Sequence, residues 1–362
     1  MTARRWFLMV LSFTLAAALI ILLVKLGKVD LRVTLQQLKN VGVLPFARIA
    51  LLNAFLVYLS TEKWRSIDAA WRCPSDSAQP RTTSYALTSI GLAMGNFLPQ
   101  QLAMATARTF GIRVHGGALK RGTAGTLLEQ SFDAITVGLL AVASGITWFC
   151  HGGAKTWTLC AAVATGLALL AVGPSVTFIQ WLVAFLKTRT ILRGGRLFRT
   201  VSELQYSGIL NTSLARRLVM LSALRFGTVV WMSVQTAEAV GLHIPAWQMA
   251  AAIPFVVFAT IIAVTPGGIG LNELACAGAL QIFGTPMAIG AQWALANRVL
   301  ISASYFFVAA CAAILLLTGK LFFTGARESM LDRLRSEKKL ASNKANPVQD
   351  SGAQGTAGIT PK

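Results

Sequence analysis

Charged residues are scarce in this 362-residue chain, and long stretches contain none. Asp, Glu, Lys and Arg make up 13% of the residues, about half the share that is usual in soluble domains. A helix needs about 20 apolar residues to cross the hydrocarbon core of a bilayer. Such uncharged runs exclude a soluble protein and predict an all-α, polytopic membrane bundle. The runs without any of the four charged residue types are 6–24, 82–107, 134–154, 156–186, 239–272, 274–297 and 299–319.

The sequence also lacks the motifs of several enzyme classes. It contains no G-x-x-x-x-G-K-[ST] phosphate loop, no H-E-x-x-H metal motif and no G-x-S-x-G nucleophile motif. The three histidines form no ligand cluster, and the five cysteines have neither disulfide-framework nor metal-site spacing. We therefore expect no ATP site, no metal, no cofactor and no catalytic residue.

The charges that are present are mostly basic and lie between the apolar runs. A formal net charge of +20 would suggest nucleic acid in a soluble protein, but no compact basic domain accompanies it, so we expect no nucleic-acid partner. With the N-terminus in the cytoplasm, the cytoplasmic segments hold 25 Lys and Arg residues and the outer loops hold five. Basic residues collect on the cytoplasmic side of membrane proteins. This asymmetry predicts a multi-pass protein of the cytoplasmic (inner) membrane with both termini in the cytoplasm.

Proline and glycine divide the apolar runs into two kinds. Pro99 interrupts the first broken run (82–107), and Pro254 together with 266–270 interrupts the second (239–279). Broken helices persist at membrane depth only when protein shields them or when they line a cavity. We predict two re-entrant helical hairpins there, which enter and leave on the same side. Six full spans are predicted at about Trp6–Val24, Val43–Thr61, Thr123–Phe149, Trp157–Leu186, Leu218–Val240 and Met287–Thr318.

The order of these elements repeats along the chain. Residues 1–150 and 157–320 each contain a span, a second span, a broken hairpin and a third span, and the two halves start on opposite sides. This order predicts an inverted-topology repeat, and paired Pro/Gly-interrupted segments indicate the binding site of a transporter. A short amphipathic helix is expected near 197–204. The polar segment 321–362 is expected to be a disordered cytoplasmic tail.

A few charges remain inside the predicted spans, where each is costly and therefore pairs or serves a pathway. Glu129 and Asp133 lie on one helix face at i and i+4. We expect Glu129 either to pair with Arg108 or Arg121 or to contact substrate. Glu273 and Arg298 form either a packing ion pair or a substrate contact, and Arg225 is interpreted as snorkelling.

Two groups of motifs carry a resemblance to a known family. In the second half, the stretch 265–273 (TPGGIGLNE) is followed by Asn297-Arg298. In the first half, 95–99 (GNFLP) is followed by Arg108 and by 128–133 (LEQSFD). These segments resemble the lysylphosphatidylglycerol synthase transmembrane-region family, also called flippase-like domain proteins. The similarity covers about residues 1–320. Gln100 and Gln101 stand where that family usually has glycines, and Gln130 stands where it commonly has an arginine.

The resemblance implies a stand-alone lipid translocator without an aminoacyl transferase domain. Its expected substrate is an anionic phospholipid, glycolipid or polyprenyl-linked lipid, and its possible partners are enzymes of lipid or glycan biosynthesis. Two alternatives stay open, a membrane-embedded lipid-modifying transferase and a non-catalytic partner of such an enzyme. The oligomeric state is left open. The expected roles are phosphate binding by Arg298 and the hairpin helix ends, and headgroup contacts by the acidic residues. The residues assigned to substrate binding are Arg298, Glu273, Gly267, Gly268, Gly270, Asn297, Glu129, Asp133 and Arg108.

Overall fold

The structure, a computed structural model, describes residues 3–72, 78–115, 119–188, 211–262 and 265–318. The predicted amphipathic helix near 197–204 and the predicted tail at 321–362 lie outside these ranges. Every regular element within them is a helix. The chain divides into two compact units, Met1–Ile314 and Leu315–Lys362, and the first contains the helices that surround the candidate site.

The long helices follow the predicted spans closely. In the described residues, five helices are long and apolar enough to cross a membrane, or up to six if the pair Ser12–Gly27 and Leu31–Lys39, bent by 99°, is one broken span. The long helices are α1 (Ala3–Gly27), α3 (Val43–Trp71), α6 (Leu119–Phe149), α7 (Ala154–Thr188), α9 (Thr212–Ala239) and α12 (Met287–Thr318). The short ones are α2 (Leu31–Lys39), α4 (Arg81–Met94), α5 (Gln100–Val114), α10 (Ala246–Ile262), the 3₁₀ helix η2 (Pro266–Gly268) and α11 (Leu271–Ile282).

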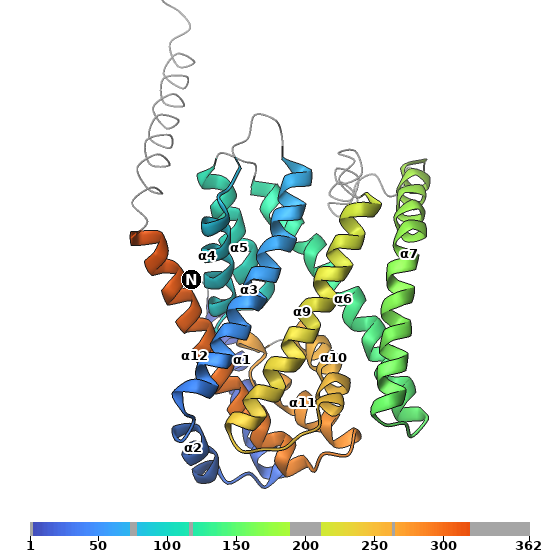
Figure 1. The fold of residues 1–362 in the computed structure, drawn as a ribbon. Coiled ribbons are helices and arrows are strands. Elements are labelled where there is room, and N and C mark those ends of the chain that lie inside the picture. Colours follow the sequence, from blue (N-terminus) through green and yellow to red (C-terminus); the bar gives the residue numbers. More distant parts are fainter. Residues whose placement is uncertain (1–2, 73–77, 116–118, 189–210, 263–264, 319–362) are drawn as a thin grey trace, which may run out of the picture. The chain divides into compact units, whose positions relative to one another are not determined.

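The first broken run forms a helical hairpin. Helices α4 and α5 have 14 and 15 residues and pack against each other, as Figure 1 shows. The chain reverses between Met94 and Gln100, where the side-chain amide of Asn96 donates to Ala93 O at 3.0 Å and Pro99 precedes α5. At about 1.5 Å per residue, each helix is about 21–23 Å long. This is shorter than the hydrocarbon core of about 30 Å. Re-entrance itself stays a prediction.

The second broken run contains α10, η2 and α11, which also pack together. Its break lies at the predicted glycine cluster, because Gly267, Gly268 and Gly270 have φ angles of 58°, 69° and 84°. Residues with a Cβ rarely adopt these angles. The prediction that Pro254 also interrupts this run was wrong, since α10 continues through it. A membrane helix tolerates such a proline when its neighbours shield the freed carbonyl.

Helix α3 is longer than predicted. This span was predicted to end at Thr61 and to be followed by a cytoplasmic loop at 62–81, but α3 continues to Trp71. Trp64 and Ile67 are buried in the added turns. Their spacing with Trp71 at i, i+3 and i+7 is that of an amphipathic helix. The charges among them suggested a loop, but Glu62, Lys63, Arg65 and Asp68 each have an ion-pair partner. The short helix α2, whose N-terminus Asp30 caps, was also missed.

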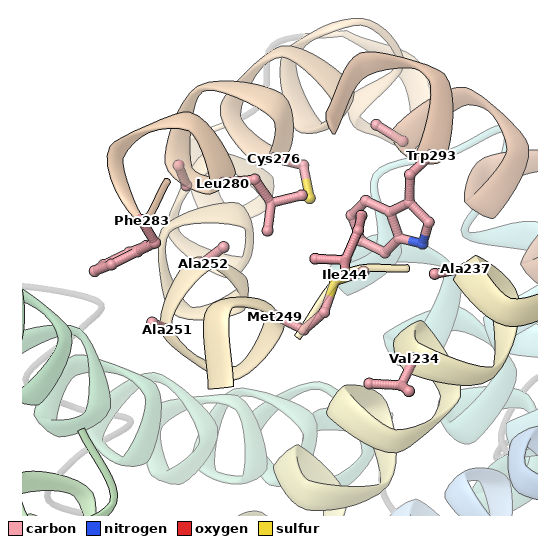
Figure 2. Packing of buried hydrophobic residues seen from close by; sticks show 12 residues of the cluster. Val234, Ala237, Ile244, Met249, Ala251, Ala252, Cys276, Leu280, Phe283 and Trp293 are labelled. Atoms are coloured by element: carbon pink, nitrogen blue, oxygen red, sulfur yellow. The ribbon is translucent and has the colours of Figure 1, made fainter. Parts of the chain in front are cut away.

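Packing joins the two predicted halves of the chain. Helix α3 packs along α9, and α6 contacts α5, α7, α9 and α10. Figure 2 shows one apolar core in which Val234, Met249, Leu280 and Trp293 bring together α9, α10, α11 and α12. The Trp293 indole donates to Ser233 O at 3.2 Å. Small residues such as Ala251 and Ala252 in this core permit close helix approach.

We predict that Gly122→Ala destabilises the bundle, because α5 and α6 are in close contact at this residue. A Cβ at Gly122 would lie 2.7 Å from Thr109 Cα, a backbone atom that can move only with its helix. Overpacking of this kind costs about 1–3 kcal/mol. Gly145→Ala in the same helix is the control, because nothing lies within 4 Å of its Cβ position. Thermal unfolding in detergent should lower the Tm of the first variant only, and equal Tm values would contradict the close contact.

Candidate functional site

Arg298 on α12 connects the tips of both hairpins. Its Nη2 donates to Gly267 O at 2.9 Å and to Asn96 O at 3.5 Å. Its Nε lies 3.7 Å from the Oε1 atom of Glu273. Ser302, one turn further along α12, donates to Asn96 Oδ1 at 2.8 Å. The guanidinium is therefore held by backbone carbonyls of both hairpins and faces one carboxylate.

Glu273 is buried and serves two partners. Its Oε2 accepts from the backbone N–H of Gly270 at 2.6 Å, at the start of α11, and its Oε1 faces Arg298. A carboxylate in this position satisfies an unpaired N–H group and the positive end of the helix dipole. The predicted ion pair with Arg298 is therefore present as a contact of 3.7 Å, and the carboxylate also caps α11.

The predicted glycine and asparagine residues shape this region. A Cβ on Gly267 would collide with the carbonyl of Asn96 and lie 2.8 Å from Arg298 Nη2. Glycine is therefore what lets the two hairpin tips approach each other. Asn297 accepts a hydrogen bond of 2.7 Å from the Thr236 hydroxyl, which holds α12 against α9.

A cavity of about 200 Å³ lies at the hairpin tips. Thr265, Asn272 and Arg298 are among its lining residues. The Thr265 hydroxyl is buried, and no hydrogen-bond partner for it lies among the described residues. In the part of the chain that the structure describes, Arg298 Nη1 also has no recorded partner. This first cavity therefore presents an arginine N–H group and a hydroxyl that a ligand can engage.

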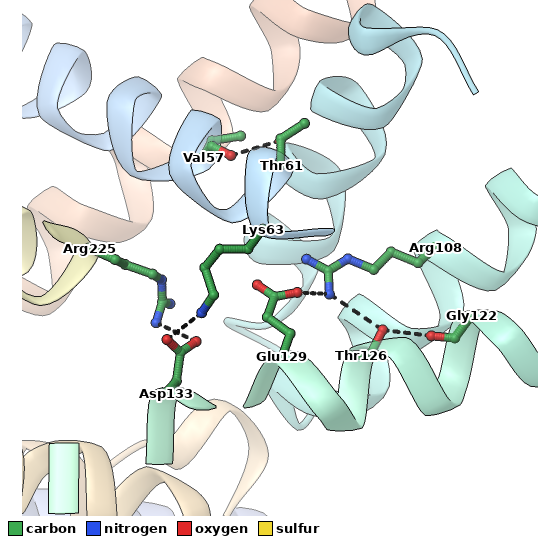
Figure 3. A network of polar contacts seen from close by, with 9 residues as sticks. All are labelled: Val57, Thr61, Lys63, Arg108, Gly122, Thr126, Glu129, Asp133 and Arg225. Carbon is green, nitrogen blue, oxygen red and sulfur yellow. Dashed lines mark hydrogen bonds and ion pairs between the residues drawn. The ribbon is translucent and has the colours of Figure 1, made fainter. Parts of the chain in front are cut away.

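A second group of charges lies where α3, α6 and α9 meet. Asp133 on α6 accepts from Lys63 Nζ at 2.5 Å and from Arg225 Nη1 at 3.3 Å. Figure 3 shows both cations converging on this carboxylate. The Lys63 side chain is 0% exposed. Arg225 contacts the Asp133 carboxylate of α6, an ion pair that the snorkelling interpretation did not include.

Glu129 is paired with Arg108 of α5, which settles the choice between Arg108 and Arg121. Arg121 instead contacts Asp68 at 3.3 Å. The Arg108 guanidinium also lies 4.8 Å from the centre of the Trp64 ring, a favourable cation–π distance. It donates to the Thr126 hydroxyl at 3.4 Å as well. Glu129 and Arg108 thus form a buried ion pair (Figure 3).

A second cavity, of about 230 Å³, adjoins the first. Arg108, Glu129, Asp133 and Arg225 are among its lining residues. The two cavities share five lining residues, so they have a common wall. These shared residues are Leu92, Gln100, Gln101, Thr260 and Tyr305.

The structure brings the nine predicted site residues into two neighbouring groups. Arg298, Glu273, Gly267, Gly268 and Asn297 line the first cavity. The second cavity is lined by Arg108, Glu129 and Asp133. Gly270 lines neither of these two cavities and donates to Glu273 instead.

The burial of Lys63 and the ion pair of Arg225 with Asp133 were not predicted from the sequence. The continued helical spacing of apolar residues beyond Thr61 was the available signal for Lys63. No local pattern identified Asp133 as the common partner, because the three residues are far apart in the chain.

The charged residues that line the two cavities are three arginines (Arg108, Arg225 and Arg298) and three carboxylates (Glu129, Asp133 and Glu273). Lys63 lines neither cavity but contacts Asp133 from behind the lining. With Lys63 included, the ion-paired set has a net charge of +1. Within the described ranges, no group of three or more His, Cys, Asp or Glu residues is placed to hold a metal ion.

These features define a multi-pass α-helical membrane protein with internal polar cavities. A scan against protein families matches residues 9–312 to the family described as Lysylphosphatidylglycerol synthase TM region. The chain belongs to this family, which links it to lipid metabolism. No curated protein and no solved structure matches the chain.

We predict that Arg108→Met strongly destabilises the protein, because it leaves the Glu129 carboxylate buried without a cation. Removing one partner of a buried pair costs about 3–5 kcal/mol. The double variant Arg108→Met with Glu129→Met should recover most of the loss. Thermal and denaturant unfolding would measure both.

Arg81→Met is the matched control for this prediction. Arg81 also contacts a glutamate, Glu62, but its side chain is 66% exposed, and exposed pairs contribute about 1 kcal/mol or less. Equal losses for Arg108→Met and Arg81→Met would show that the buried pair has no special role in stability.

Proposed function

We propose that this protein translocates an anionic lipid, a phospholipid, glycolipid or polyprenyl-linked lipid, across the cytoplasmic membrane. The observation that carries the proposal is the ion-paired set at two adjoining cavities in a membrane-embedded bundle, where four cations, Lys63 behind the lining among them, meet three carboxylates. A charge at the centre of a bilayer costs at least about 2.5–3.5 kcal/mol. One further anion would complete the set of four cations and three carboxylates. A phosphodiester carries the single negative charge that is needed.

Arg298 is the group that would bind the phosphate. An arginine side chain keeps its charge and offers several N–H donors in a planar fork that fits phosphate oxygens. Nη2 is used by the hairpin carbonyls, whereas Nη1 has no recorded contact in the described chain. The Thr265 hydroxyl also lacks a hydrogen-bond partner among the residues that the structure describes. Both groups belong to the lining of the first cavity.

The two hairpins differ in what their helix ends offer an anion. Helix α11 begins beside Glu273, whose carboxylate already accepts from Gly270 N. Helix α5 begins after Pro99 without a side-chain cap, and its first residues, Gln100 and Gln101, line both cavities. Unpaired N–H groups at a helix start favour negative charge. Together with Arg298, the start of α5 would attract the phosphate.

The topology that we propose has six full spans, two re-entrant hairpins and both termini in the cytoplasm. The short lengths of α4, α5 and α11, together with the meeting of both hairpin breaks at Arg298, support re-entrance. The repeated order of span, span, hairpin and span supports an inverted repeat. In this arrangement a lipid headgroup would move past the residues that line both cavities, while its acyl chains stay in the bilayer.

We expect Arg298→Gln to lower lipid translocation about ten- to a hundredfold. The amide can still donate to the hairpin carbonyls, but it loses the charge, and a hydrogen bond to a charged group contributes about 1.5–3 kcal/mol. The assay uses proteoliposomes that contain only this protein and acyl-labelled phosphatidylglycerol, with leaflet-resolved quenching. Arg48→Gln, which changes an exposed arginine on α3, is the control.

Three results would count against the proposed function. A folded Arg298→Gln variant with wild-type rates would remove Arg298 from the pathway. Equal rates for labelled phosphatidylcholine would remove the requirement for a net negative charge on the lipid. A new lipid species in the mass spectrum, without leaflet exchange, would favour the lipid-modifying transferase.

The topology predicts that the tip of the α4–α5 hairpin is inaccessible from outside the cell. A cysteine at Leu98, in a chain without its native cysteines, should not react with a membrane-impermeant maleimide added to intact cells. A cysteine at Gly42, in the proposed outer loop, should react. Labelling of Leu98→Cys at the rate of Gly42→Cys would show that the hairpin crosses the membrane completely.

A further inference from the structure

The second cavity contains hydrogen-bonding groups that the ion pairs leave unused. Gln100, Gln101 and Gln130 contribute three side-chain amides to its lining, and Tyr305 contributes a hydroxyl. All four residues are partly buried. No hydrogen bond is recorded for any of these side-chain groups within the described part of the chain. Water can satisfy these partly buried groups, and a polar ligand that enters the cavity can take the place of that water.

The amides favour a particular kind of headgroup. A glutamine side chain offers two N–H donors and one acceptor oxygen, and a phenol hydroxyl both donates and accepts. Hydroxyl groups on a ligand can bind both the donors and the acceptors of these side chains, because each hydroxyl donates and accepts. Three neutral amides beside a phenol therefore match a ring that carries several hydroxyls.

The carboxylates of the cavities are already occupied. Glu129 is paired with Arg108, and Asp133 is held by two cations at 2.5 and 3.3 Å. Glu273 caps α11 and faces Arg298. A cationic headgroup would therefore find each of these carboxylates already paired. The acidic residues were predicted to contact a polar or cationic headgroup, and this placement argues against the cationic alternative.

We infer that the lipid substrate carries an uncharged, hydroxyl-rich headgroup, a sugar or cyclitol joined through a phosphodiester. This inference rests on the proposed function. The phosphate lies at Arg298 in the first cavity, and the ring lies among Gln100, Gln101 and Gln130 in the second. One lipid can place both groups in this way because the cavities adjoin at Gln100 and Gln101, which line both. The phosphate and the ring are also neighbours in such a lipid.

The test compares lipids that differ only in the headgroup, bound to the purified full-length protein in nanodiscs. Phosphatidylinositol carries the phosphodiester and the hydroxylated ring. Phosphatidylmethanol carries the same charge without hydroxyls, and lysylphosphatidylglycerol carries a cationic headgroup. We expect phosphatidylinositol to bind about three- to tenfold more tightly than phosphatidylmethanol, the equivalent of one neutral hydrogen bond. Lysylphosphatidylglycerol should bind most weakly.

The variant Gln130→Leu locates the ring, because Gln130 lines the second cavity and not the first. It should abolish the advantage of phosphatidylinositol and leave the affinity for phosphatidylmethanol unchanged, because the phosphate site is retained. Gln36→Leu is the control, since Gln36 is exposed on α2 and lines neither cavity. A Tm close to that of the wild-type protein shows that the Gln130→Leu variant is folded.

The outcomes separate this inference from the proposed function. Equal affinities for the three lipids, tightest binding of lysylphosphatidylglycerol, or no binding of any lipid would overturn the headgroup inference. An unchanged preference in the folded Gln130→Leu variant would do the same. Selective binding of phosphatidylinositol without leaflet exchange in proteoliposomes would support the headgroup inference and count against translocation.

Discussion

The arrangement of this protein depends on the need of every buried charge for a partner. Inside a membrane, water cannot screen a charge, so each ionised side chain must meet a counter-ion or a backbone dipole. Asp133 joins α6 to Lys63 on α3 and to Arg225 on α9. Arg298 joins α12 to the tips of both hairpins. These contacts connect the two halves of the chain, and they fix where the cavities lie, because the ion pairs form much of the cavity lining.

The breaks in the two hairpins provide backbone groups for a polar site. A continuous helix satisfies its own backbone and presents only side chains, whereas a helix that restarts exposes N–H groups. At Pro99 no side chain caps the new helix, and the start of α5 faces the cavities. In the second hairpin, Glu273 caps α11. The hairpins therefore have different electrostatic roles despite their similar order of elements, and Gly267 allows the two tips to meet.

In the proposed function, charge and hydrogen bonding have separate parts in the recognition of a lipid. The net charge of +1 on the ion-paired set would favour an anion but would not distinguish one phosphodiester from another. Selection among headgroups then depends on neutral groups, because the carboxylates are occupied by arginine, lysine and a helix start. In this chain, glutamines at positions 100, 101 and 130 line the second cavity. Membership in the lysylphosphatidylglycerol synthase TM region family thus leaves room for a different headgroup.

The sequence by itself determined the membrane helices and the places where they break. Uncharged runs of sufficient length must cross or enter the bilayer, and Pro99 and the glycines at 267, 268 and 270 change the backbone locally. The predicted bounds of the last span, Met287–Thr318, agree with those of α12. Only the tertiary structure decided that Lys63 is buried, that Pro254 leaves α10 intact and that Glu129 pairs with Arg108 rather than Arg121. These outcomes depend on which distant helices meet, because a charge or a broken hydrogen bond is tolerated only where another segment supplies its partner.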